Sequence, residues 1–167
     1  TIASDTPANI KGVTDELVRL WDDRPGWWGK LTAVQNDAVG ARMLLTGFFF
    51  LLLGGSLDSF VMRLQLARPE SEIVGPELYN QLFTNHGSVT MFLVILPIFE
   101  GFAILMLPLL LGSREMAFPR LGAFAYWTFL MGGLLYYSST LFQAVPDAGW
   151  FAYTPLSLNE FSPDLNL

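Results

Sequence analysis

The chain has 167 residues, of which 52% are hydrophobic and 14% are charged. Its mean hydropathy of +0.43 is well above that of ordinary soluble domains. A net charge of -6 provides no basic surface for nucleic acid, so nucleic acid is not an expected partner. Because cysteine is absent, disulfides, thiolate metal sites and cysteine nucleophiles are excluded. This composition is typical of an integral membrane protein.

Residues 1–38 form a polar tail with a possible short amphipathic helix that would lie at the membrane surface. The apolar residues of that helix are Leu17, Leu20 and Trp21. The neighbouring pair Trp27 and Trp28 is typical of aromatic anchors at the headgroup level. We interpret the tail as a structural anchor.

Three windows of the sequence are long and apolar enough to cross a bilayer, whose core of about 30 Å requires roughly 20 helical residues. These windows are residues 39–64, 87–112 and 121–142. The remaining segments are an outer loop leading into the second helix, an inner loop and an outer segment, at residues 65–86, 113–120 and 143–167. The sequence therefore predicts an all-α integral membrane fold with three transmembrane helices.

The basic residues are distributed unequally between the two sides of the membrane. The side shared by the tail and the inner loop has Lys11, Arg19, Arg24, Lys30, Arg42, Arg114 and Arg120. The opposite side has Arg63 and Arg68. Because cytoplasmic segments carry an excess of Lys and Arg, we expect the N-terminus in the cytoplasm, or in the matrix of an organelle.

His86 is the only histidine, and it stands where polar residues give way to the second apolar window. A lone histidine at such a place is ordinarily a hydrogen-bonding group at the interface. The alternative is axial ligation of haem iron, for which a neutral imidazole nitrogen is suited. Gly87 favours that alternative because it leaves room for a flat cofactor. A site with several histidine ligands would need residues from outside this chain.

Three ionisable residues, Asp58, Arg63 and Glu100, lie in or beside apolar windows. A charge at the centre of a membrane helix costs about 2.5 to 3.5 kcal/mol, so we expect each to face protein, water or a cofactor. For Glu100, the deepest, a proton relay and a buried protonated acid both remain open. Arg63 and Asp58 are not spaced for an ideal ion pair. Arg63 either reaches the outer headgroups or donates to a buried carbonyl or propionate.

Two segments outside the apolar windows contain further candidate residues. Glu115 lies in the inner loop, where a solvated acid is the ordinary interpretation. The outer segment 143–167 is rich in proline and aromatic residues. That composition is typical of an ordered loop that covers helix ends or meets a partner.

Five separated motifs occur in the same order as in one known family. They are "MRLQLARP" at 62–69, "ELYNQLFTNHG" at 77–87, "MAFPRL" at 116–121, "GGLLYYSS" at 132–139 and "PDAGWFAYTPLS" at 146–157. Together they resemble subunit I of the haem-copper respiratory oxidases, the catalytic subunit of cytochrome c oxidase. The resemblance covers about residues 31–167. It implies that the three helices are the first part of the helical bundle of subunit I.

The resemblance also implies roles for individual residues. His86 matches the first of two axial histidines of low-spin haem a, which passes electrons to the oxygen-reducing centre. Arg63 matches the arginine that bonds the formyl group of that haem, and Glu115 the acid at the mouth of a proton-uptake channel. Trp150 and Tyr153 match outer-loop aromatics near the subunit that delivers electrons.

The chain departs from the family where proton channels are usually lined with polar side chains. The matching positions here are apolar or lack a polar group, namely Ile104, Leu105, Gly122 and Ala123. "VQND" at 34–37 replaces the family's usual "VDHK". Glu100 is a candidate for a variant proton route, and Asp58 has no assigned counterpart.

The remaining ligands of the family, for copper, for high-spin haem and for the other side of low-spin haem, lie in later helices. The resemblance implies that this chain alone has no oxidase activity and that the later helices complete the enzyme. Those helices belong either to the same subunit I, of which this chain is a fragment, or to a separate chain. The implied partners are subunits II and III, cytochrome c and the lipid bilayer of a bacterial plasma membrane or mitochondrial inner membrane. Two alternatives remain, a non-catalytic structural subunit derived from an oxidase N-terminus and a stand-alone three-helix haem protein.

Overall fold

The computed structural model describes residues 7–21, 26–142 and 144–161, which fall into two compact units. The first unit, residues 1–33, contains α1 (Pro7–Trp21) and α2 (Trp27–Thr32). Trp27 and Trp28 are both exposed and stack with their ring centroids 4.0 Å apart. Leu17 is also exposed, whereas the side chains of Leu20 and Trp21 lie outside the described residues.

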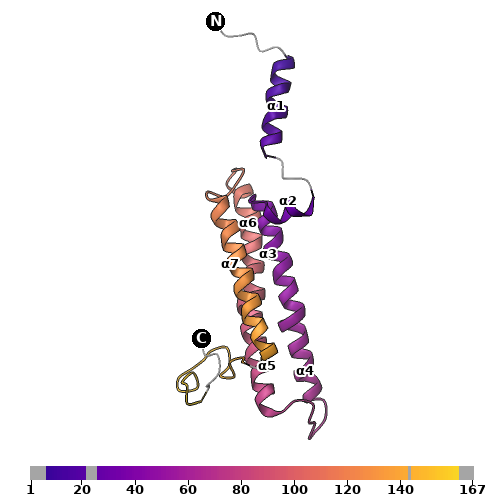
Figure 1. The fold of residues 1–167 in the computed structure, drawn as a ribbon, viewed down its shortest axis with the longest axis vertical. Coiled ribbons are helices and arrows are strands. Elements are labelled where there is room, and N and C mark those ends of the chain that lie inside the picture. The colour runs from indigo at the N-terminus through magenta and orange to yellow at the C-terminus, as the bar shows by residue number, and fades with distance from the viewer. Residues whose placement is uncertain (1–6, 22–25, 143, 162–167) are drawn as a thin grey trace. The chain divides into compact units, whose positions relative to one another are not determined.

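The second unit, residues 34–167, is built from long helices (Figure 1). The first is continuous from Asn36 to Gln65 and comprises α3 (Asn36–Phe50), the π-helical η1 (Leu51–Leu57) and α4 (Asp58–Gln65). The second runs from Pro76 to Leu110 and comprises α5 (Pro76–Ser88), the π-helical η2 (Val89–Ile95) and α6 (Leu96–Leu110). The third is α7 (Pro119–Ser138), followed by the 3-10 turn η3 (Ser139–Phe142).

Two of these helices are long and apolar enough to cross a membrane. They are Asn36–Gln65 and Pro76–Leu110, with mean hydropathies of 1.7 and 2.4. No strand occurs in the described part of the chain, so the all-α prediction is confirmed. The third predicted window corresponds to α7, a helix of 20 residues that begins slightly before the predicted boundary and ends in the 3-10 turn.

The second long helix begins at Pro76, well before the predicted start at Gly87. Proline is favoured in the first turn of a helix, and the acidic Glu77 in that turn complements the helix dipole. The predicted segment 65–86, an outer loop with the entry to the second helix, is therefore helical from Pro76 onward. Three polar side chains of this stretch, Gln81, Thr84 and Asn85, are buried within the protein, so a polar sequence forms part of the same helix.

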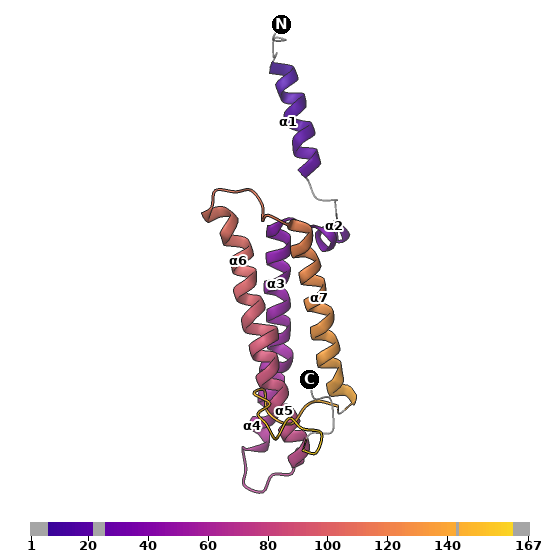
Figure 2. The same cartoon turned by 90° about the vertical axis from the view of Figure 1, so that its left-hand side faces the viewer.

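Close backbone contact between α3 and α6 forms the centre of the second unit. Figure 2 shows α3 between α6 and α7. A Cβ atom added at Gly101 would lie 3.0 Å from the carbonyl oxygen of Gly40, and one added at Gly40 would lie 3.0 Å from the carbonyl oxygen of Gly101. Small residues allow such approach between helices in lipid, where apolar burial supplies little attraction.

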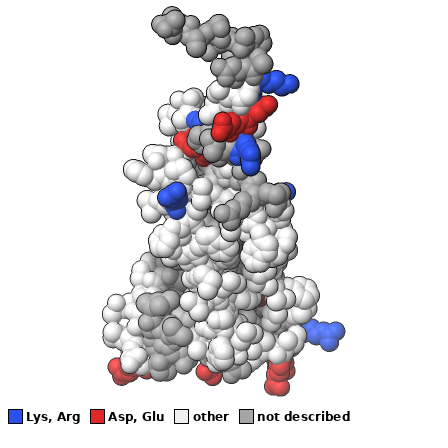
Figure 3. Space-filling model, turned by 45° about the horizontal axis from the view of Figure 1, so that its top comes forward, with Lys and Arg blue, Asp and Glu red and all other residues white. Residues whose placement is uncertain are grey.

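Two small clusters of buried side chains pack around this contact. One, against α7, contains Val39, Met43, Ala123 and Tyr126. The other, at the level of the π-helical segments, contains Phe50, Val89, Leu93 and Val94. Many large apolar side chains remain on the outside, including Phe99 at 71% and Leu109 at 78% exposure. Figure 3 shows, on the visible face of this unit, charged residues toward the helix ends and a broad uncharged band between them. Such a surface suits lipid or further apolar helices.

Replacing Gly101 with valine should separate α3 from α6 and lower the free energy of unfolding by about 1–3 kcal/mol, as overpacked contacts do. The matched control is Gly132→Ala, because a Cβ at Gly132 meets no atom of the described chain within 4 Å. Thermal unfolding in detergent measures both. Equal midpoints for Gly101→Val and the unsubstituted protein would contradict the close contact.

Candidate functional site

His86 lies at the end of α5, half-buried, immediately before the π-helical η2. Its Nδ1 atom is 2.9 Å from the carbonyl oxygen of Gly54, which belongs to the π-helical η1 of the first long helix. A π-helical turn inserts an extra residue into a helix and occurs often at functional sites. The histidine therefore joins the two long helices at the level where both depart from α-helical geometry.

Position 54 must be glycine for this contact to form, because Val89 fills the space that a side chain would need. A Cβ atom at position 54 would lie 2.5 Å from Cγ1 and 2.7 Å from Cβ of Val89. Atoms cannot approach so closely, so any side chain at this position would push η1 away from η2. The same displacement would withdraw the Gly54 carbonyl from His86.

The hydrogen bond to Gly54 determines which imidazole nitrogen carries the proton. A carbonyl oxygen can only accept, so Nδ1 must donate, and in the neutral imidazole Nε2 then keeps its lone pair. Within the described part of the chain, Nε2 has no hydrogen-bond partner. A histidine held through one nitrogen with the other free is the arrangement that metal-ligating histidines adopt.

A second polar contact lies beside the first, and the sequence analysis did not find its partners. Asp58 is only 3% exposed. Its Oδ2 accepts a hydrogen bond of 2.6 Å from Nδ2 of Asn85, and its Oδ1 accepts one of 3.3 Å from the hydroxyl of Tyr137. The sequence contains one signal for these partners: an acid at membrane depth requires hydrogen-bond donors at the same depth on neighbouring helices.

Arg63, the second residue that the resemblance assigns to haem, lies in the last turn of α4 and is exposed. It makes no ion pair with Asp58, whose oxygens are both bonded to other helices. The structure therefore places Arg63 on the surface of the described chain and Asp58 in its interior. Their different environments agree with the expectation that they do not form an ideal pair.

Gly87 faces an indole ring. A Cβ atom at Gly87 would lie 2.9 Å from Cδ1 of Trp150. Trp150 is half-buried and also approaches Phe92 edge-on, with ring centroids 6.3 Å apart. The side of the helix next to His86 that carries Gly87 is thus covered by the outer segment.

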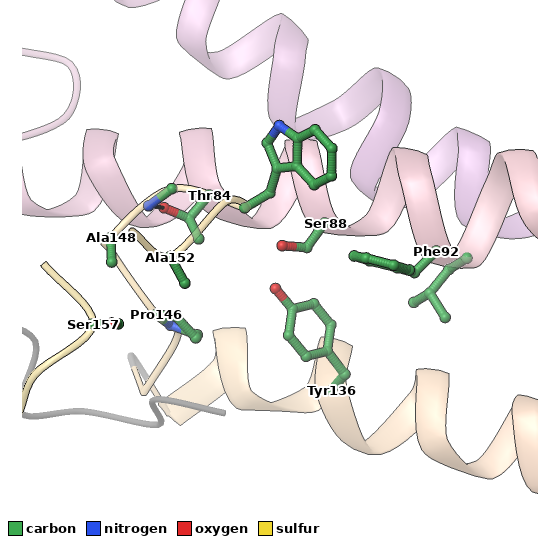
Figure 4. Close-up of a pocket in the computed structure, with 11 residues that line it drawn as sticks. Thr84, Ser88, Phe92, Tyr136, Pro146, Ala148, Ala152 and Ser157 are labelled. Atoms are coloured by element: carbon green, nitrogen blue, oxygen red, sulfur yellow. Dashed lines mark hydrogen bonds between the residues drawn. The ribbon is translucent and has the colours of Figure 1, made fainter. Parts of the chain in front are cut away.

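The outer segment is attached to α5 by a specific hydrogen bond. Thr84 Oγ1 accepts the backbone N–H of Gly149 at 2.9 Å and donates to the carbonyl of Asn80 at 2.8 Å. A cavity of about 340 Å³ lies between this segment, α5, η2 and α7. Its lining includes Ser88 and Tyr136, whose hydroxyl groups point toward one another in Figure 4.

The two predicted outer aromatics face different surroundings. Trp150 turns inward against Gly87, as described above. Tyr153 is 69% exposed and stacks on Phe151, with ring centroids 5.3 Å apart and parallel planes. Of the two, only Tyr153 presents most of its surface to the outside of the described chain.

At the opposite end of the bundle, Glu115 is bonded to the start of the first long helix. Its Oε2 accepts the backbone N–H of Asn36 at 3.0 Å, in the first turn of α3. Asn36 in turn donates from Nδ2 to the carbonyl of Ile104 on α6, at 3.4 Å. Glu115 is therefore a half-buried cap that joins the inner loop to α3, rather than a fully solvated loop acid.

Glu100 and Asn36 line a common cavity near this inner end. The cavity has a volume of about 280 Å³ and is otherwise lined mainly by apolar side chains of α3, α6, the inner loop and α7. Glu100 itself is exposed on α6. The structure thus connects Glu115, through Asn36, with the cavity that Glu100 lines.

Metal-binding clusters are absent from the part of the chain that the structure describes, since no three His, Asp or Glu side chains gather there. The two long apolar helices and the polar contacts enclosed between helices are typical of an all-helical membrane protein.

Comparison with known families identifies the chain further. The family profile of cytochrome c and quinol oxidase polypeptide I matches residues 38–166, and the chain belongs to this family. The resemblance inferred from the sequence motifs is thereby confirmed.

Individual relatives agree with this assignment. Cytochrome c oxidase subunit 1 of Synechocystis sp. is 46% identical over 125 residues, which cover 75% of this chain and 22% of that protein. The corresponding subunit of Bacillus sp. PS3 is 39% identical over 132 residues, or 79% of this chain and 21% of that protein. The subunit of Bacillus subtilis is 36% identical over 132 residues, which cover 79% of this chain and 21% of that protein. The chain spans less than a quarter of the length of these curated relatives.

The cap formed by Glu115 leads to a prediction about stability. Glu115→Ala removes the acceptor for the Asn36 N–H and should lower the free energy of unfolding by about 1 kcal/mol, as loss of a helix cap does. Glu115→Gln retains a side-chain oxygen and should lose less. Thermal unfolding in detergent distinguishes them, and an alanine variant as stable as the glutamine variant would contradict the capping role.

Proposed function

We propose that the chain is the N-terminal part of the catalytic subunit of a haem-copper terminal oxidase. In this proposal it supplies three transmembrane helices, α7 being the third, and His86 as one axial ligand of low-spin haem. The proposal is supported by membership of the family and by relatives named as cytochrome c oxidase subunit 1. The single observation that carries it is the imidazole of His86, which is held at Nδ1 and has no partner at Nε2 among the residues that the structure describes.

The residues present fit a haem iron at this position. The Nδ1–H bond to the Gly54 carbonyl orients the ring and increases the basicity of Nε2, as outer partners of metal-bound histidines do. Haem, when bound, supplies one-electron transfer, and haem a is the type that the family resemblance implies. Arg63 stands exposed at the end of α4 as the candidate donor to a substituent of the ring. Because Trp150 occupies the space beside Gly87, we leave Gly87 out of the proposed haem contacts.

Proton uptake is proposed to begin at the inner end of the bundle. Glu115 would receive protons at the membrane surface, and Glu100 would continue the route from the cavity that it shares with Asn36. This arrangement would replace the polar side chains that the family usually has and that Gly122 and Ala123 lack here. Protons taken up there would serve water formation and pumping.

The remaining parts of the proposal follow from the family. The N-terminus would lie in the cytoplasm of a bacterium, or in the matrix of a mitochondrion. Further helices would supply the second axial ligand, copper and high-spin haem, and subunits II and III would complete the assembly. Tyr153, as an exposed outer aromatic, would lie near the partner that receives electrons from cytochrome c.

The ligand role of His86 is tested by His86→Ala in the purified assembly. The expected result is loss of the low-spin haem absorbance, because no other histidine in this chain can take its place. Thr84→Ala, on the same helix, serves as a control that should retain the absorbance. An unchanged spectrum in the His86 variant would instead favour a non-catalytic structural subunit, and haem retained by this chain expressed alone would favour a stand-alone haem protein.

The proton route is tested by Glu115→Gln, which retains an acceptor for Asn36 but cannot relay a proton, and by Glu100→Gln. Both should slow turnover by roughly 100-fold, the lower end of what a positioned proton-transfer group contributes. Glu72→Gln, which changes an exposed acid of the outer loop, should leave turnover unchanged. Normal turnover and normal proton stoichiometry in both variants would rule out the route.

A further inference from the structure

The carboxylate of Asp58 connects all three long helices of the second unit. The residue itself belongs to α4, Asn85 donates to it from α5, and Tyr137 donates to it from α7. With 3% exposure, the side chain has almost no access to solvent. A carboxylate at this depth is costly, so it persists only where donors from the surrounding protein are provided.

Asn85 is the residue that connects Asp58 to the proposed haem ligand. It is fully buried, and it immediately precedes His86 in α5. Its Oδ1 has no hydrogen-bond partner among the described residues, so the 2.6 Å bond from Nδ2 to Asp58 is what orients the amide. Removing Asp58 would leave both ends of a buried amide unsatisfied, which strongly disfavours the present position of this stretch of α5.

Two hydrogen bonds therefore run side by side between the first and second helices. Gly54 accepts from His86, and Asp58, one turn further along the first helix, accepts from Asn85. The first bond orients the imidazole directly. The second fixes the position and rotation of α5 next to it, and Tyr137 holds the same carboxylate from the third helix.

We propose that Asp58 is a positioning residue for the axial histidine: by holding Asn85 and Tyr137 it sets the orientation of the His86 ring toward the haem iron. This inference rests on the proposed function of His86. Asp58 does not touch the haem in this proposal: it acts through Asn85 on the helix that carries both Asn85 and His86, and Tyr137 contributes by holding the Asp58 carboxylate in place for Asn85.

The neighbouring Ser59 provides a matched control. Its hydroxyl donates only within its own helix, to the carbonyls of Gly55 at 2.7 Å and Ser56 at 2.9 Å. Ser59→Ala therefore removes a polar group at the same depth without changing any contact between helices. Tyr137→Phe is a milder variant of the network, because it removes one bond to Asp58 and leaves the bond to Asn85 in place.

The experiment records the electron paramagnetic resonance spectrum and the midpoint potential of low-spin haem in the whole purified oxidase. Asp58→Ala should shift the g values, which report ligand orientation, and should shift the midpoint potential, because outer hydrogen-bond partners orient and tune the ligands of a metal. Asn85→Ala should give the same shift, and the double variant should add nothing to it, because the two residues act in series. Ser59→Ala should match the unsubstituted enzyme.

An unchanged spectrum and potential in an Asp58→Ala oxidase that retains its haem would overturn the inference. Should that variant fail to assemble, Tyr137→Phe decides: a shift of the g values and midpoint potential supports the inference, and no shift overturns it. His86→Ala, measured in parallel, separates failure of the positioning role of Asp58 from failure of the proposed ligand role of His86. Loss of low-spin haem there with no effect at Asp58 refutes only the positioning role, whereas retention of low-spin haem there refutes the proposed function as well.

Discussion

Within a bilayer, a polar group must find its partner inside the protein, and the interior of this bundle is organised by that constraint. Several polar side chains at depth meet across helices: Asp58 with Asn85 and Tyr137, His86 with the Gly54 carbonyl, and Thr46 with Tyr126 at 3.1 Å. Apolar side chains can face lipid at little cost, so these polar contacts and the glycine contacts determine how the helices are rotated about their axes.

The constraint has different consequences at the two ends of the bundle. At one end it holds the imidazole of His86, shortly before η2, against a carbonyl of the π-helical η1 and near Trp150. At the opposite end Glu115 caps the first helix. The proposed role of Glu115 in proton uptake is compatible with this capping role, because a single backbone N–H occupies only part of the acceptor capacity of a carboxylate.

Sequence reasoning predicted the helices and the family, and it identified His86 as the residue most suited to ligate iron. It did not indicate how far the second helix extends before Gly87, because Gln81, Thr84 and Asn85 are polar yet buried, which hydrophobicity cannot indicate. It assigned Gly87 to a cofactor, whereas the space beside that glycine holds Trp150, a residue far along the chain. The partners of Asp58 were also missed, since they lie on two other helices whose relative rotation is not encoded in any local pattern.

The sequence by itself therefore determined the environment of the protein, its helical content, its family and its one candidate imidazole, because hydropathy, length and short motifs are local properties. The tertiary structure alone decided which nitrogen of His86 bonds the Gly54 carbonyl, which residues hold Asp58, and which helix start Glu115 caps. Those facts depend on the rotation and depth at which one helix meets another. They arise only when the close approach at Gly40, Gly54 and Gly101 brings distant residues into hydrogen-bonding distance.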